Sequence, residues 1–137
     1  ACPSQECTKK VLLDDDGNWR CEKCDRSYPA PVRRYIFSAN VADYTGQIWV
    51  SGFNEVGETL LGITADQQDV IQNESQAGFK AVWSRAIGRV IELGCRAKQE
   101  TFNDSSRVRY TMTRLQPVDF KKAGHELVNK IHALQAN

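Results

Sequence analysis

Three features of the sequence predict a mainly β fold. Residues 33–53 and 88–117 each hold two segments of alternating apolar and polar side chains joined by a turn, which is the pattern of a β-hairpin. A segment with helical spacing separates the two hairpins. Because the intervening residues are too few for parallel crossovers, we expect all strand pairs to be antiparallel.

The first hairpin follows the break at Pro29-Ala30-Pro31. A turn at residues 44–47 joins its first strand, in residues 33–43, to a second strand with the sequence IWVSGF. The first strand alternates strictly, so that one of its faces is apolar. That face comprises Tyr35, Phe37, Ala39 and Val41.

The helix and the second hairpin follow from residue 74 onward. Residues 58–73 show no strict alternation, whereas the next stretch predicts a helix of about three turns. Two long strands follow, joined at residues 101–105, where Asn103 and Asp104 supply turn chemistry. Gly94 in the first of them predicts a bend or a bulge. The helix is predicted from the apolar residues Phe79, Val82, Trp83 and Ala86.

Four of the five cysteines lie within the first 24 residues and form two close pairs. The stretch between the pairs, VLLDDDGNW, is typical of a short strand, a tight turn at Asp16-Gly17-Asn18 and a second strand. Such a hairpin brings two cysteine-bearing turns together, and thiolates select zinc over hard cations. The sequence therefore predicts a closed structural zinc site, a zinc ribbon, with the ligands Cys2, Cys7, Cys21 and Cys24.

Disulfide bonds and redox catalysis are the alternatives for these cysteines. Disulfides need an oxidising compartment, and the odd fifth cysteine and the lack of a signal segment argue against one. A redox Cys-x2-Cys more often lies beside a βαβ pattern, which the sequence lacks. The fifth cysteine, Cys95, is expected to be a small buried thiol.

The strand count favours an oligonucleotide-binding (OB) barrel. An OB barrel has five strands with a helix between the third and the fourth, and four long strands are recognisable here. We therefore expect the first strand to precede Ala1. The expected domains are a zinc ribbon at residues 1–32, the barrel at residues 33–117 and a C-terminal amphipathic helix at residues 118–137.

The terminal helix carries a heptad-like apolar seam. Its apolar residues recur at steps of four and three and alternate with lysines and other polar residues. A helix offered to partner helices and a helix packed on its own barrel are both consistent with this pattern. The seam consists of Phe120, Gly124, Leu127, Ile131 and Leu134.

Composition excludes several classes of protein. With 137 residues, of which 41% are hydrophobic and 26% charged, the chain suits one domain with a small appendage and is not disordered. No apolar run approaches the ~20 residues that span a bilayer, so we expect a soluble intracellular protein without membrane contact. Because a metal ligand stands at position 2 and no Met begins the chain, we expect a piece of a longer polypeptide.

Charge is unevenly distributed although the net charge is only +1. Residues 43–74 contain six acidic residues and no Lys or Arg, whereas residues 85–114 contain seven basic and three acidic residues. A basic stripe that binds a polyanion is one explanation, and ordinary solvated strand edges are the other.

Several motifs together resemble one protein family. They are the Cys-x4-Cys pair followed by RCEKCD, the hairpin ending in WVSGF, the turn ETFNDSSRVRYT and the amphipathic terminal helix. In this order they resemble the C-terminal DNA-binding domain of the large subunit of replication protein A, the eukaryotic heterotrimer that binds single-stranded DNA. The resemblance covers essentially the whole chain.

The resemblance implies a function in DNA replication, repair and recombination in the nucleus. It implies that the ribbon is inserted after the first barrel strand, and that the terminal helix joins helices of the middle and small subunits in a three-helix bundle. The partner-binding residues would be Phe120, Leu127, Ile131 and Leu134. The aromatic residues implicated in base stacking correspond to Phe53 and Phe102, the latter where the family often has Tyr.

Physical reasoning from the residues agrees with this mechanism. Single strands bind without sequence readout when bases stack on aromatic side chains and cations follow the phosphates. Phe53 and Phe102 have polar neighbours, although either could instead fill the barrel. Arg107 and Arg109 share a strand face and could meet phosphates or be plain surface residues. Neighbouring candidates for phosphate contact are Arg33 and Lys98.

Other function classes have less support. No phosphate loop, nucleophile elbow or paired-carboxylate motif is present, and His125 and His132 are expected to be surface residues, so we do not expect an enzyme. The main alternative is an assembly module with little DNA binding of its own. A paralogue of the same architecture that serves telomeres or meiosis is a further one.

Overall fold

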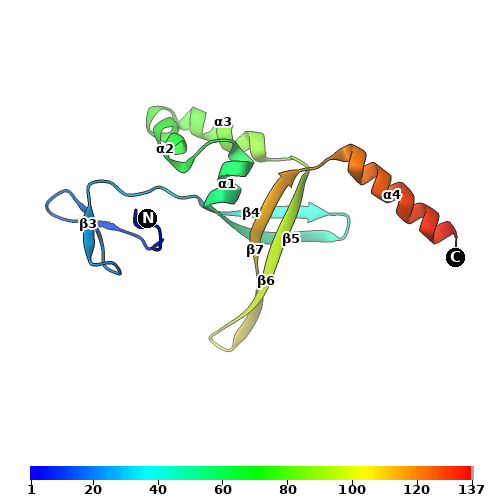
Figure 1. The fold of residues 1–137 in the computed structure, drawn as a ribbon, viewed down its shortest axis with the longest axis horizontal. Coiled ribbons are helices and arrows are strands. Elements are labelled where there is room, and N and C mark those ends of the chain that lie inside the picture. The colour runs from blue at the N-terminus through cyan, green and yellow to red at the C-terminus, as the bar shows by residue number, and fades with distance from the viewer. Residues whose placement is uncertain (137) are drawn as a thin grey trace.

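The computed structural model describes residues 1–136 and contains two β-sheets and four helices in that range (Figure 1). A small sheet lies near the N-terminus, a larger sheet with three helices follows, and a fourth helix ends the chain. In order, the elements are β1 (Leu12–Leu13), β2 (Trp19–Cys21), β3 (Arg26–Tyr28), β4 (Ile36–Asp43), β5 (Gly46–Phe53), α1 (Asn54–Leu61), α2 (Ala65–Glu74), α3 (Gln76–Ala86), β6 (Ile91–Phe102), β7 (Ser105–Pro117) and α4 (Phe120–Gln135).

The N-terminal sheet is an antiparallel ribbon in the order β1-β2-β3. Its first turn is organised by Asp14, whose carboxylate accepts hydrogen bonds from the amides of Asp16 and Asn18 at 3.1 and 3.0 Å. Gly17 takes a left-handed conformation there, with φ of 78°, which glycine adopts without steric cost. The hairpin predicted around Asp16-Gly17-Asn18 is therefore confirmed.

The larger sheet has the order β4-β5-β7-β6. The predicted hairpins are present as β4–β5 and β6–β7, both antiparallel. The expectation that every pair is antiparallel is wrong, because β5 and β7 pair in parallel where Val50 and Ser51 meet Tyr110 and Thr111. The parallel pair follows from the path of the chain. After β5 the chain passes through α1, α2 and α3 to β6 at the far edge of the sheet, and it reverses direction in the β6–β7 hairpin. β7 therefore runs in the direction of β5.

The sheet is not closed into a barrel in residues 1–136, since each of the outer strands, β4 and β6, pairs on one side only. Between them lies an open trough of about 1,080 Å³, whose apolar lining includes Phe37, Leu60, Trp83 and Leu93. The fold is also more helical than the predicted mainly β class. We therefore describe it as mixed α/β, with a cysteine cluster near the N-terminus and a C-terminal helix.

Two of the three central helices were not predicted. The helix expected from Glu74 is α3, but α1 and α2 cover most of the stretch that lacked alternation, and α1 begins before it at Asn54. α1 ends at Gly62, which is left-handed with φ of 75°, and α2 begins with a capping box between Thr64 and Gln67. Both are helix-end signals that can be read from sequence.

The main core lies between the sheet and α1. Its buried residues are Val50, Leu60, Met112 and Leu115. Beside it, the ring of Trp83 on α3 packs edge-on against Tyr35 and Phe37, with ring centroids 6.2 and 5.8 Å apart. The Tyr35 hydroxyl donates to the carbonyl oxygens of Ile63 and Thr64, both at 3.1 Å. The aromatic cluster therefore fixes α3 and the α1–α2 turn onto the start of β4.

The β6–β7 hairpin projects away from the core (Figure 1). The strand register shifts between Gly94 and Cys95, which pair with Arg114 and Met112 and leave Thr113 as the extra residue. The irregularity predicted at Gly94 is thus confirmed. Beyond it, the hairpin continues to a two-residue turn in which Asn103 and Asp104 are both left-handed.

Helix α4 continues from the end of β7 opposite the hairpin tip (Figure 1). None of its described residues is buried. The helix is therefore not packed on the larger sheet in residues 1–136. Its seam is solvent-exposed, with Phe120 at 70%, Leu127 at 59% and Leu134 at 78% exposure. No helix within residues 1–136 is both long and apolar enough to cross a membrane.

Candidate metal centre and nucleic-acid interface

The four N-terminal cysteines converge on one point. Their sulfur atoms all lie within 4.8 Å of one another. Cys2 and Cys24 are 3.9 Å apart between sulfurs, and Cys7 and Cys21 are 3.8 Å apart. A tetrahedron with Zn–S bonds of ~2.3 Å has sulfur–sulfur edges of ~3.8 Å, whereas a disulfide needs ~2.05 Å. The spacing fits a tetrahedral metal site and all four thiols are free.

The surroundings of the cluster hold the ligands in place. Three of the four cysteines are buried, and together with Val11 they form the small core of the ribbon, against which Trp19 and Tyr28 pack. The elements that carry the ligands make no core with the larger sheet, so the ribbon has a hydrophobic core of its own.

The thiols differ in how readily they ionise. Burial raises the pKa of Cys2, but hydrogen bonds from the Ser4 backbone and the Tyr28 side chain outweigh it and lower that pKa from 9.0 to about 7. A hydrogen bond with the Cys7 sulfur, together with burial, raises the pKa of Cys24 to about 12. A bound divalent cation would favour deprotonation of all four thiols, because it binds them as thiolates.

The fifth cysteine lies elsewhere. Cys95 on β6 is exposed, so the expectation of a buried thiol is wrong for the described chain. It lies on the wall of the open trough, which the chain does not fill within residues 1–136.

The outer face of the β6–β7 hairpin is basic. The register places Lys98 directly opposite Arg109, Arg96 opposite Thr111 and Glu100 opposite Arg107. Side chains opposite each other in an antiparallel pair have Cβ atoms ~4.5–5.5 Å apart and share a face of the sheet. Like charges held this close repel, which is unfavourable unless an anion binds between them.

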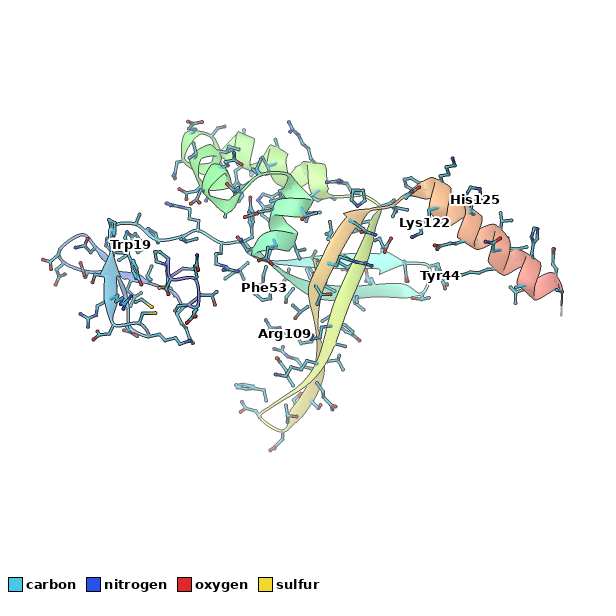
Figure 2. The ribbon with its side chains drawn as sticks, in the orientation of Figure 1. Trp19, Tyr44, Phe53, Arg109, Lys122 and His125 are labelled. Carbon is cyan, nitrogen blue, oxygen red and sulfur yellow. The ribbon has the colours of Figure 1, made fainter. Side chains whose placement is uncertain are left out.

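A groove of about 540 Å³ runs along this face; we call it the basic groove. Phe53 forms one wall, at the point where β5 ends and α1 begins. Figure 2 shows Phe53 and Arg109 on the same side of the hairpin. Two carboxylates, Glu55 and Glu100, also border the groove. Its main polar and aromatic lining is Phe53, Arg96, Lys98, Arg109, Thr111 and Thr113.

The second aromatic candidate lies at the tip of the hairpin. Phe102 is the last residue of β6, pairs with Ser105 across the two-residue turn and is 75% exposed. Phe53 is 40% exposed. Neither aromatic ring is buried in a hydrophobic core, so both can contact a ligand.

The cationic candidates separate into two groups. Lys98 and Arg109 line the basic groove, and Arg107 lies further along the same face. Arg33 is ion-paired with Asp69 and Asp66 of α2, at 2.8 and 3.9 Å, and does not line the groove. Of the sequence-derived candidates, Phe53, Lys98 and Arg109 meet in the groove, Arg107 and Phe102 lie on the same strand face toward the hairpin tip, and Arg33 lies elsewhere.

Two exposed residues were not proposed from sequence. Arg96 lines the basic groove, whereas Trp49, 67% exposed on β5, borders the open trough. The signal for Trp49 was its alternation with the buried Val50. Arg96 was visible only as one of several bases, because the strand register decides which of them face the groove.

The family profile described as "Replication factor-A C terminal domain" matches residues 1–127. The "Replication factor A protein 1" of Schizosaccharomyces pombe is 39% identical over 135 residues, which are 98% of this chain and 22% of that protein. The "Replication protein A 70 kDa DNA-binding subunit" of Mus musculus is 39% identical over 131 residues, 96% of this chain and 21% of the relative. The chain thus spans about a fifth of the length of these relatives.

Two solved structures are similar in fold. "Structure and Conformational Change of a Replication Protein A Heterotrimer Bound to ssDNA" describes a chain that is 56% identical, with a TM-score of 0.87 over 97% of this chain and 31% of that one. "Yeast RPA bound to ssDNA" describes a chain that is 32% identical, with a TM-score of 0.85 over 98% of this chain and 75% of that one.

Proposed function

Because the chain belongs to the replication factor A C-terminal domain family, we propose that it binds single-stranded DNA without reading base sequence. It would do so within a heterotrimeric complex of DNA replication, repair and recombination in the nucleus. The observation that carries the proposal is the basic groove, where Phe53 faces Lys98 and Arg109. As a homologue of a DNA-binding subunit, the chain is not an enzyme.

The mechanism combines stacking with charge. Bases stack on Phe53 and Phe102, while phosphates follow Arg96, Lys98, Arg107 and Arg109 along the hairpin. An exposed aromatic face accepts any base, and a guanidinium or ammonium group accepts any phosphate. The binding is therefore expected to be independent of sequence and strongly dependent on salt.

The cysteine cluster is proposed to hold one structural zinc ion. Cys2, Cys7, Cys21 and Cys24 would be its ligands, since four soft sulfur donors with tetrahedral spacing fit zinc. Zinc supplies folding free energy to a ribbon whose own apolar core is small. A four-thiolate site leaves no open position for catalysis.

The larger sheet is proposed to be an OB barrel closed by a strand from upstream of Ala1. Ala1 and Val32 exchange two backbone hydrogen bonds, of 2.6 and 2.9 Å, which is an antiparallel pairing. Continuing this pairing would direct the preceding residues along the free edge of β4, over the apolar trough. The domains would then be a ribbon at residues 1–32, a barrel at residues 33–117 and an assembly helix at residues 118–137.

Helix α4 is proposed to assemble the heterotrimer. Burying a Leu or Ile side chain contributes roughly 1.5–3 kcal/mol, so a helix with an exposed seam gains by packing on other helices. The partners would be one helix each from the middle and small subunits. Their contacts on this chain would be Phe120, Leu127, Ile131 and Leu134.

An assembly module of a paralogous telomeric or meiotic OB complex, with little DNA binding of its own, is the second candidate. The exposed α4 seam favours assembly, but it does not account for the basic groove. The two candidates differ in one measurement, the affinity for bare oligonucleotides as a function of salt.

The test is oligo-dT binding by the full-length protein and its variants. Phe53→Ala with Phe102→Ala is expected to weaken binding by roughly 2–6 kcal/mol at a nearly unchanged salt slope, because stacking contributes about 1–3 kcal/mol per base. Arg109→Ala is expected to lower the slope by about 0.7 instead. A double aromatic variant that is folded and binds as tightly as the parent would contradict the proposal and favour the assembly module.

A further inference from the structure

One carboxylate lies among the cations on the outer face of the β6–β7 hairpin. The strand register defines this face between the tip and the bulge as four cross-strand pairs. Four of the eight side chains are cations, three are uncharged, and one is Glu100. The pairs are Phe102 with Ser105, Glu100 with Arg107, Lys98 with Arg109, and Arg96 with Thr111.

Glu100 is placed to interact with two of these cations. Its carboxylate lies 3.8 Å from the guanidinium of Arg109, and it stands directly opposite Arg107. The Glu100 side chain is 32% exposed, less than that of Arg109 at 48%, and it borders the basic groove. In the free protein this negative charge reduces the repulsion between Lys98 and Arg109.

The same charge is unfavourable once DNA binds. A phosphate that approached Arg109 in the groove would also approach Glu100, and two negative charges at that distance repel. The ion pair between Glu100 and Arg109 would also have to weaken, because the guanidinium cannot serve both anions with full strength.

We propose that Glu100 is an internal counter-ion of the basic groove, which competes with the phosphates of single-stranded DNA for Arg109. The inference rests on the proposed DNA binding and adds a residue that weakens it. Removing the charge of Glu100 therefore strengthens binding, although most substitutions at a binding surface weaken it.

The test compares Glu100→Gln with Glu92→Gln in the full-length protein, using fluorescently labelled oligo-dT. The amide keeps the size of the side chain and removes the charge. We expect Glu100→Gln to bind about two- to tenfold more tightly at low salt, because a weak exposed ion pair no longer competes for Arg109 and a phosphate repulsion is removed as well. The gain should shrink as added salt screens the charges.

Glu92→Gln is the matched control. Glu92 lies on the same strand and pairs with Arg114 of β7 at 2.9 Å, but neither residue lines the groove. We expect its affinity to equal that of the parent. The Arg109→Gln background supplies a second measurement, because Glu100→Gln should gain less there than in the parent if part of its effect is competition for Arg109.

The outcomes are distinct. If Glu100 instead orients Arg109 toward DNA, Glu100→Gln binds more weakly than the parent, and that result or an unchanged affinity overturns the inference. If Glu92→Gln gains as much as Glu100→Gln, the effect is one of net charge and the inference is also wrong. A parent protein whose binding does not depend on salt would overturn the proposed function as well.

Discussion

Lys98 and Arg109 are direct cross-strand neighbours with like charge, on the wall of a groove. Folding alone does not favour this pair, since opposed like charges destabilise a hairpin. We predict that Lys98→Gln stabilises the free protein by about 0.2–1 kcal/mol while it weakens oligo-dT binding and lowers the salt slope by about 0.7. Urea unfolding and salt-dependent binding would measure the two effects, and a loss of both stability and affinity would contradict the prediction.

Two glycine-to-alanine substitutions are expected to act in opposite directions. A Cβ atom at Gly57 in α1 would lie 2.7 Å from the buried Tyr35 ring, whereas one at Gly124 in α4 would meet nothing within 4 Å. Gly57→Ala should therefore destabilise the domain by about 1–3 kcal/mol, through the overpacking of its core. Gly124→Ala should stabilise α4 in the free protein by up to about 1 kcal/mol, which is the difference in helix propensity between Gly and Ala.

Chemical denaturation followed by circular dichroism would compare these two variants. If the two substitutions changed the free energy of unfolding equally, helix propensity alone would decide the outcome at Gly57, and the overpacking prediction would be wrong. In the assembled complex Gly124→Ala carries a second expectation, because a new methyl group on the proposed seam should weaken assembly.

The ribbon and the larger sheet are expected to lose structure separately. Cys21 is fully buried, so Cys21→Ser should abolish zinc retention and unfold β1–β3, while β4–β7 keep their amide protection. Elemental analysis and hydrogen exchange would measure this. Cys95→Ser is the control and should retain one zinc per chain, because Cys95 lies outside the cluster. Stoichiometric zinc in Cys21→Ser would contradict the assignment of the ligands.

Much of the fold and of the metal site could be predicted because their signals are local. The two hairpins follow from alternation, and the ribbon follows from the cysteine spacing around Asp16-Gly17-Asn18. Helix α1 was missed because it has no side-chain cap, and the lack of alternation in residues 58–73 argues against a strand without itself indicating a helix. The capping box of Thr64 and Gln67 was the readable signal.

The parts that could not be predicted depend on strand register and tertiary contacts. Arg33 looked like any other base, but the fold places it against Asp69 of α2, where it is ion-paired. The pairing of Lys98 with Arg109 follows from a two-residue turn at Asn103-Asp104, and a turn placed only approximately at residues 101–105 leaves the register undetermined.

Acid should loosen the β4–β5 turn. A hydrogen bond from the Thr45 hydroxyl, supported by the amides of Thr45 and Gly46, lowers the pKa of Asp43 below its ordinary value of 3.8. A lowered folded-state pKa adds stability above the ordinary value, and this is lost as the pH falls through the lowered one. Amide exchange in β4 and β5 should therefore be faster in Asp43→Ala than in the parent near neutral pH. A difference that persists at the most acidic pH would contradict the role of the ionised carboxylate.

The proposed assembly through α4 can be tested on two opposite sides of the helix. Leu127 and Ile131 lie one turn apart on the exposed seam, and His125 and Asn129 lie one turn apart on roughly the opposite side of the helix. Changing Leu127 and Ile131 to Glu should abolish co-purification with the proposed partner subunits, because two charges would have to be buried in the proposed helix bundle. Changing His125 and Asn129 to Glu adds the same residues at the same spacing and should leave assembly intact. Zinc content and the unfolding midpoint should stay at parental values in both variants, since no α4 residue is part of either core. Assembly that survives the first pair of changes, or fails equally with both, would show that the seam is not the contact surface.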